Sequence, residues 1–132
     1  IVYGDTFRGA ESSYPGTGRT CFEAKVHDIG ETFTKGKFDQ PFLVNGAVLD
    51  GAWQGWLGST CGIASEDDFG TSEPMVPKYI GELEISAEMP GTIGYTMLGF
   101  ARSQKYGFSE FSANISLFDT EVSKVLVSVS DY

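Results

Sequence analysis

Basic residues and long apolar runs are both scarce in this chain. Its 132 residues include 9 Lys and Arg against 18 Asp and Glu, which gives a formal net charge of −9 at pH 7. Binding to the phosphates of nucleic acid or of an anionic membrane depends on Lys and Arg, so this composition excludes both as partners. A membrane-spanning helix needs about 18 consecutive apolar residues, and no such run is present, so we expect no membrane insertion.

Groups that carry catalysis or bind metals are also few. The one histidine, His27, has no Gly-x-Ser-x-Gly nucleophile motif to serve, and one His with two Cys is too few for a closed zinc site. Glu82, Glu84 and Glu88 loosely resemble the acidic strand of laminarinase-like glycosidases, but we interpret them as the solvated face of a strand. The sequence therefore predicts no catalytic residue, no metal site and no cofactor, and hence no enzyme.

Two possibilities stay open at this stage. The acidic segment 66–73, with Asp50 nearby in the sequence, has oxygen ligands that a calcium ion could use, although it lacks the spacing of an EF-hand. Asn114 begins an Asn-Ile-Ser triplet, which fits the acceptor pattern for N-glycosylation. Neither pattern is long enough to decide the matter.

The cysteines and the first residue favour a secreted protein. The two cysteines, Cys21 and Cys61, form an even pair, and the sequence begins at Ile1 without an apolar leader, as a processed exported protein would. We therefore expect one disulfide between them and an extracellular or cell-surface location. The alternative is a pair of buried free thiols.

Period-2 alternation of apolar and polar residues indicates β-strands. It is clearest where Phe22, Ala24 and Val26 follow Cys21, and it recurs further along the chain. The other expected strands are 82–89, 93–101, 115–118 and 125–129, and a hairpin is expected at Asn45-Gly46. Many short strands with intervening turns predict an all-β fold, an immunoglobulin-like or jelly-roll β-sandwich with one disulfide, over residues 19–132.

The first 18 residues differ from the rest. Residues 1–7 read as a short strand, and residues 8–18 are rich in Gly, Ser and Pro without periodicity, so we interpret 1–18 as an N-terminal arm and linker. Aromatic residues near Gly or polar residues are candidates for stacking on a sugar. These candidates are Trp53, Trp56, Tyr106 and Phe108, and the two tryptophans should face opposite sides of one strand.

The chain resembles fimbrial subunits of the chaperone-usher class in three features. These are the cysteine spacing, an element from Val26 to Gly30 and a C-terminal strand from Val125 to Tyr132. This resemblance implies an incomplete sandwich that the arm of an identical or related subunit completes by β-strand exchange. The donor-strand residues would be Ile1, Val2, Tyr3 and Phe7. The resulting hypothesis is a structural or adhesive subunit of a surface filament. The alternatives are an arm that pairs with its own sheet and a carbohydrate-binding module that uses the exposed aromatics.

Overall fold

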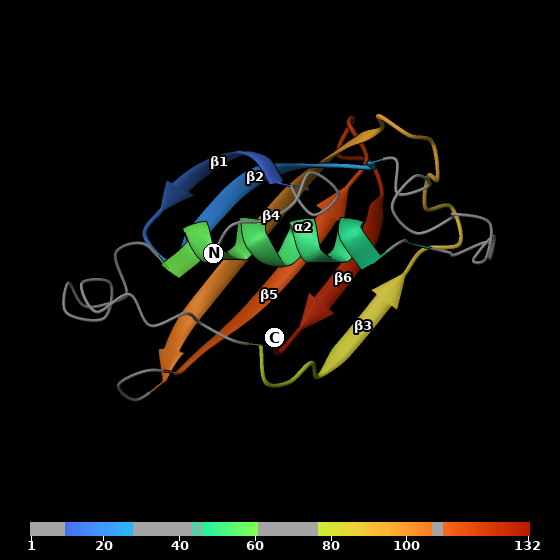
Figure 1. The fold of residues 1–132 in the computed structure, drawn as a ribbon. Helices are drawn as coiled ribbons and strands as arrows, with labels where there is room; N and C mark the ends of the chain where they lie inside the picture. The colour runs from blue at the N-terminus through green and yellow to red at the C-terminus, as the bar shows by residue number, and fades with distance from the viewer. Residues whose placement is uncertain (1–9, 28–43, 45, 61–76, 107–109) are drawn as a thin grey trace, which may run out of the picture.

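The computed structural model describes residues 10–27, 44, 46–60, 77–106 and 110–132. Their elements are β1 (Ala10–Gly16), β2 (Arg19–Lys25), α2 (Gly46–Trp56), the 3-10 helix η2 (Leu57–Thr60), β3 (Glu82–Ile85), β4 (Thr96–Tyr106), β5 (Glu110–Phe118) and β6 (Val125–Ser130). The strands form one six-stranded sheet in the order β1-β2-β4-β5-β6-β3, with every neighbouring pair antiparallel. Figure 1 shows α2 lying across one face of this sheet.

The sequence prediction of a mostly β protein is confirmed, but the sandwich is wrong. A sandwich buries its sheet against a second sheet, whereas the described strands belong to a single sheet whose inner face packs against α2. Within the described residues, no helix is long and apolar enough to cross a lipid bilayer.

The core lies between α2 and the inner face of the sheet. Phe22, Ala24 and Val26 are at most 3% exposed, which confirms the alternation expected after Cys21. Phe22 lies opposite Gly99 on β4, and Gly99 lies opposite Leu117 on β5, so these residues form one row across the inner face. The helix places Gly55 against Phe22 from the other side.

The expected alternation on β3 is confirmed in direction but not in depth of burial. Leu83 pairs with Val129 and Ile85 pairs with Val127, so both project toward the inner face with those buried valines. Glu82 and Glu84 are exposed, as expected. Leu83 is nevertheless 39% exposed, because β3 is an edge strand of the sheet.

The hairpin expected at Asn45-Gly46 is wrong, because residues 46–56 form a helix. The buried side of α2 consists mostly of small residues that let the helix approach the sheet closely: Ala47, Val48, Gly51, Ala52, Gly55 and Trp56. Three glycines give this segment a low intrinsic helix propensity. Tertiary packing against the sheet therefore supplies most of the stability of α2.

The N-terminal part also differs from the expected linker. Residues 1–9 lie outside the described part, but residues 10–16 form β1, which pairs with β2 through a tight hairpin. Gly18 has a φ of 66° in this turn, a backbone conformation that suits glycine. The hairpin thus crosses the boundary that we expected at residue 19.

Candidate functional site

The two tryptophans lie on α2, so the expectation that they face opposite sides of a strand is wrong. Residues three apart on a helix are neighbours on its surface, and both indoles contact Tyr132. The Trp53 ring stacks on Tyr132 with centroids 5.8 Å apart and planes 6° apart. The Trp56 ring meets Tyr132 edge-on at 5.3 Å. Trp56 is only 8% exposed, which leaves little of its ring for stacking on a sugar.

The other sequence-predicted site residues lie on separate elements or outside the described part of the chain. Tyr106 is 55% exposed at the end of β4, and its hydroxyl donates to Gln104 Oε1. Phe108, the arm residues Ile1, Val2, Tyr3 and Phe7, and the acidic segment 66–73 lie outside the described residues. Asn114 is exposed on β5, and its Oδ1 accepts a hydrogen bond from the Asp131 backbone N–H.

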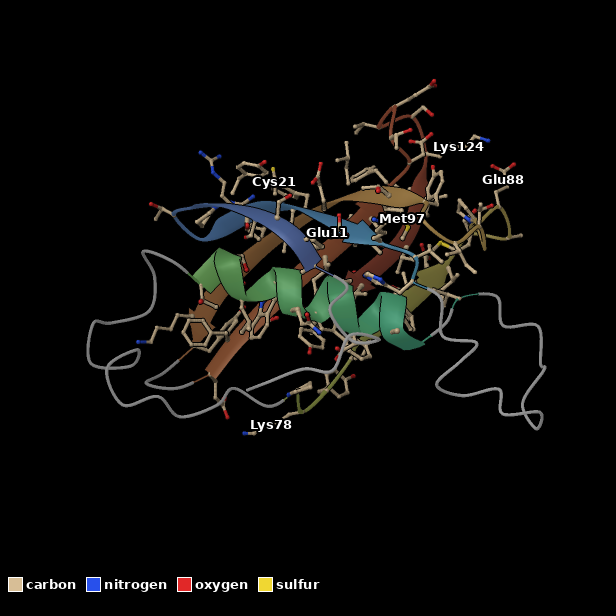
Figure 2. The ribbon with its side chains drawn as sticks, turned by 45° about the horizontal axis from the view of Figure 1, so that its top comes forward. Glu11, Cys21, Lys78, Glu88, Met97 and Lys124 are labelled. Carbon is tan, nitrogen blue, oxygen red and sulfur yellow. The ribbon has the colours of Figure 1, made fainter. Side chains whose placement is uncertain are left out.

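The expected disulfide is not shown. Cys21 has a free thiol and projects from the outer side of the sheet, away from α2, as Figure 2 shows. Cys61 lies outside the described residues. The described residues also contain no cluster of His, Cys, Asp and Glu that could hold a metal ion.

Glu82, Glu84 and Glu88 are exposed and do not form a carboxylate pair for catalysis. Glu82 and Glu84 lie on the outer side of β3, while Glu88 lies beyond the strand and forms an ion pair with Lys124. The two side chains of this ion pair approach each other in Figure 2. The hydrogen bond with Glu88 is the main cause that raises the pKa of Lys124.

Asp50 is the carboxylate best placed to take part in a reaction. Asp50 and Gln54 are half-buried residues of α2. The Gln54 side-chain amide donates to Asp50 Oδ2 at 2.5 Å, as residues four apart on a helix can. Among the described residues, the second carboxyl oxygen of Asp50 has no hydrogen-bond partner.

A buried hydrogen-bond network fixes the helix that carries Asp50. The Trp56 indole N–H donates to Ser103 Oγ on β4 at 2.8 Å, and the Ser59 hydroxyl shares a hydrogen bond with Ser103. Ser59 also donates to the Trp56 carbonyl at 2.7 Å. Since all three side chains are buried, these bonds stabilise one position of α2 on the sheet.

Trp53 has no such partner for its indole. Its Nε1 atom is shielded from solvent and has no hydrogen-bond partner among the described residues, and its ring stacks on Tyr132. A buried unpaired donor is unusual in a native protein and calls for an explanation. The helix α2 thus carries a carboxylate and an amide that orients it, and its Trp53 indole is packed against the core.

Asp50 and Gln54 do not emerge as a pair from the sequence, because the turn signal at Asn45-Gly46 predicts a hairpin and not a helix in this part of the chain. One signal could have found them. Counting glycine and alanine as core residues reveals a helical repeat at 47, 48, 51, 52, 55 and 56. On that helix, an Asp followed four residues later by a Gln places the two polar groups side by side.

No protein-family model matches the chain. The chain is, however, 49% identical over its 132 residues to a reducing polyketide synthase of Floropilus chiversii, and it spans 5% of that protein. It is 48% identical over 132 residues to a reducing polyketide synthase of Metacordyceps chlamydosporia, of which it spans 6%. The chain is also 49% identical over 130 residues to a highly reducing polyketide synthase of Gibberella zeae, of which it spans 5%. The chain therefore corresponds to a small segment of these relatives.

Solved structures share its fold. The dehydratase domain of RzxB from Pseudomonas fluorescens superposes with a TM-score of 0.70 at 17% identity, over 98% of this chain and 41% of that one. A second solved structure, GphF Dehydratase 1, gives a TM-score of 0.68 at 16% identity, over 98% of this chain and 43% of that one. The arrangement of one antiparallel sheet around a helix is the hot-dog fold of these domains.

These findings correct the functional expectations. The fimbrial resemblance is wrong, and with it the filament subunit, its strand exchange with identical or related subunits, and the glycan-binding alternative. The expected secreted or cell-surface location, which was inferred from the cysteine pair and the first residue, is also contradicted. The expectation that the chain has no enzymatic role is also wrong, because its relatives are synthases. The chain is thus similar over its whole length to a segment of fungal reducing polyketide synthases, and it has the fold of dehydratase domains.

Proposed function

We propose that this chain is part of the dehydratase site of a reducing polyketide synthase, and that Asp50 is its proton-transferring acid. The observation that carries the proposal is the Asp50–Gln54 pair on the helix of a dehydratase-like fold. The substrate would be a β-hydroxyacyl thioester, because reduction of a polyketide carbonyl yields a hydroxyl whose loss as water gives an enoyl product.

The proposed reaction is an elimination. A base removes a hydrogen from the α-carbon, the electron pair forms the α,β double bond, and the β-hydroxyl leaves. Hydroxide is a poor leaving group, so an acid must give it a proton as the carbon–oxygen bond breaks, and water results. Asp50 is suited to this task, because its second oxygen has no hydrogen-bond partner among the described residues.

Gln54 would assist in two ways. Its amide holds one carboxyl oxygen, which fixes the direction in which the other oxygen points. The same hydrogen bond stabilises the negative charge that Asp50 acquires once it has given up its proton. The segment α2 contains no other titratable side chain, so the base would come from outside this helix.

The test is an Asp50→Asn substitution in the full-length protein, assayed with a β-hydroxyacyl thioester. An amide cannot supply the proton, so we expect the rate of dehydration to fall about 10²- to 10⁴-fold and the hydroxyacyl compound to accumulate. Glu84→Gln is the matched control, because Glu84 is an exposed carboxylate on the edge strand and should leave the rate unchanged. An Asp50→Asn protein that dehydrates within threefold of the wild-type rate contradicts the assignment.

A further inference from the structure

The backbone that follows β6 departs from regular strand pairing by one residue. On β5, Ile115 pairs with Val129, so a regular register would place Ala113 opposite Asp131. Ala113 instead exchanges both backbone hydrogen bonds with Tyr132, at 3.0 Å each. Three residues after Val129 therefore stand opposite two residues of β5, which defines a β-bulge with one extra residue.

This bulge decides which side chain enters the core. Val129 and Ala113 are 1% and 2% exposed on the inner face of the sheet. Strict alternation would direct Asp131, two residues after Val129, into the same core. The bulge instead leaves Asp131 exposed and turns Tyr132 inward, where Tyr132 packs against the core residues. An aromatic ring thus takes the place that the regular strand would give to a carboxylate.

The neighbouring residues are arranged to hold the bulge. Asp131 has a φ of 54°, a backbone conformation that is uncommon for residues other than glycine. Its backbone N–H donates to Asn114 Oδ1 at 3.2 Å, and the Gly81 N–H donates to the Ser130 and Asp131 carbonyls at 3.1 Å each. A Cβ at Gly81 would lie 2.8 Å from Asp131 Cβ, so this close approach requires glycine. A strained bulge whose polar groups all find partners is a specified feature, and such bulges often aim a side chain beside an active site.

The side chain that the bulge aims is the one that contacts both tryptophans of α2. Tyr132 stacks on Trp53 with centroids 5.8 Å apart and meets Trp56 edge-on at 5.3 Å. Its backbone is paired with β5, so Tyr132 links the helix to the sheet through its ring on one side and its main chain on the other. Trp53 follows Asp50 by three residues, which is about one helical turn. Tyr132 therefore supports the turn of α2 that comes directly after the proposed acid.

We propose that Tyr132 is a positioning residue for Asp50, and that the bulge at Asp131 serves to hold Tyr132 in this role. The proposal rests on the proposed function, because it takes Asp50 as the acid of the dehydration. Tyr132 acts through α2: its ring fills the space between the two indoles and β5, and removal of the ring lets the helix shift with Asp50 on it. A displacement of about 1 Å in a reacting group can cost about 10²-fold in rate.

The test is Tyr132→Leu in the full-length protein, assayed with a β-hydroxyacyl thioester well below the unfolding temperature and expressed per folded molecule. Leucine keeps an apolar side chain but has no ring to meet the indoles, so we expect kcat to fall about 10- to 10²-fold with KM within about threefold of wild type. Tyr132→Phe keeps the ring and should restore kcat to within about threefold of wild type. Asn114→Ala removes the acceptor of the Asp131 N–H and should give a smaller loss of kcat at unchanged KM. Wild-type kcat in Tyr132→Leu overturns the proposal, and wild-type kcat in Asn114→Ala overturns the role given to the bulge.

Ile85→Ala is the matched control for loss of stability. Ile85 also packs against the core, but it lies on the edge strand β3, two strands away from the β5 residue that pairs with Tyr132. The change should lower the urea midpoint, because it removes buried apolar volume, and should leave kcat per folded molecule within about threefold of wild type. An Ile85→Ala protein that loses as much kcat as Tyr132→Leu overturns the proposal, because any weakening of the core would then have the same effect.

A double-mutant cycle with Asp50 separates this proposal from the function on which it rests. In Asp50→Asn the acid is already absent, so adding Tyr132→Leu should lower kcat no further than about threefold. A further loss as large as the one in the wild-type background overturns the proposal, because Tyr132 would then not act through Asp50. A wild-type protein that does not dehydrate the thioester, or an Asp50→Asn protein that keeps the full rate, refutes the proposed function. Dehydration that requires Asp50 but is insensitive to Tyr132→Leu refutes only this inference.

Discussion

Adding one methyl group at Gly55 should destabilise the protein, because α2 approaches Phe22 without room for a side chain. A Cβ atom at position 55 would lie 2.4 Å from Phe22 Cδ2 and 2.5 Å from Cγ. Non-bonded carbon atoms prefer separations of about 3.5 to 4.0 Å, so the overlap is about 1 Å or more. The Phe22 ring cannot retreat toward the sheet, because a Cβ built at Gly99 on the other side would lie 2.3 Å from the ring.

The magnitude follows from two opposing effects. Overpacking a well-filled core costs about 1 to 3 kcal/mol, and the absence of free space on both sides of Phe22 puts Gly55→Ala at the upper end. The higher helix propensity of alanine returns about 1 kcal/mol. We therefore expect the free energy of unfolding of the chain to fall by about 2 kcal/mol, which shifts the urea midpoint by about 1 M.

Two variants make this prediction specific. Gly46→Ala, in the same helix but with nothing within 4 Å of the added Cβ, should be neutral or stabilising by up to about 1 kcal/mol. Combining Gly55→Ala with Phe22→Leu should cost less than the sum of the two single changes, because the smaller side chain admits the methyl group. A Gly55→Ala chain as stable as wild type would refute the close helix–sheet approach.

Three further predictions concern single residues. Ser103→Ala removes the acceptor of the Trp56 N–H and should lower the free energy of unfolding by about 1 to 3 kcal/mol in urea melts. Val122 has a φ of 55° and is 56% exposed. Val122→Gly should relieve backbone strain, raise the free energy of unfolding by about 0.5 to 1 kcal/mol and so raise the thermal midpoint. A lower midpoint would contradict this. The hydrogen bond from the Ser123 hydroxyl, followed by that from the Lys124 backbone N–H, holds the pKa of Asp119 below its ordinary 3.8. The stability that the ionised Asp119 contributes should therefore be present above pH 3.8 and be lost as the pH falls through the lowered pKa of Asp119. An NMR titration of the Asp119 carboxyl with a midpoint at or above 3.8 would contradict the third prediction.

The sequence by itself determined the strands whose two faces differ. Phe22, Ala24 and Val26 alternate with polar residues, and the structure buries all three. The alternation of Leu83 and Ile85 with the acids of β3 also gave the correct faces. Period-2 patterns are reliable here because a strand with one buried face allows only one register, so the local pattern and the tertiary fold agree.

Only the tertiary structure decided α2, and with it the candidate site. Asn45-Gly46 and Asp50-Gly51 are strong local turn signals, and a segment with three glycines has little tendency to form a helix alone. The helix exists because Gly55 admits Phe22 and because Trp56 and Ser59 bond to Ser103 across the core. Asp50 and Gln54 become neighbours only on that helix. Local propensity is worth a fraction of a kcal/mol per residue, whereas burial of a packed face is worth several, so packing overrode the turn signals and created the site.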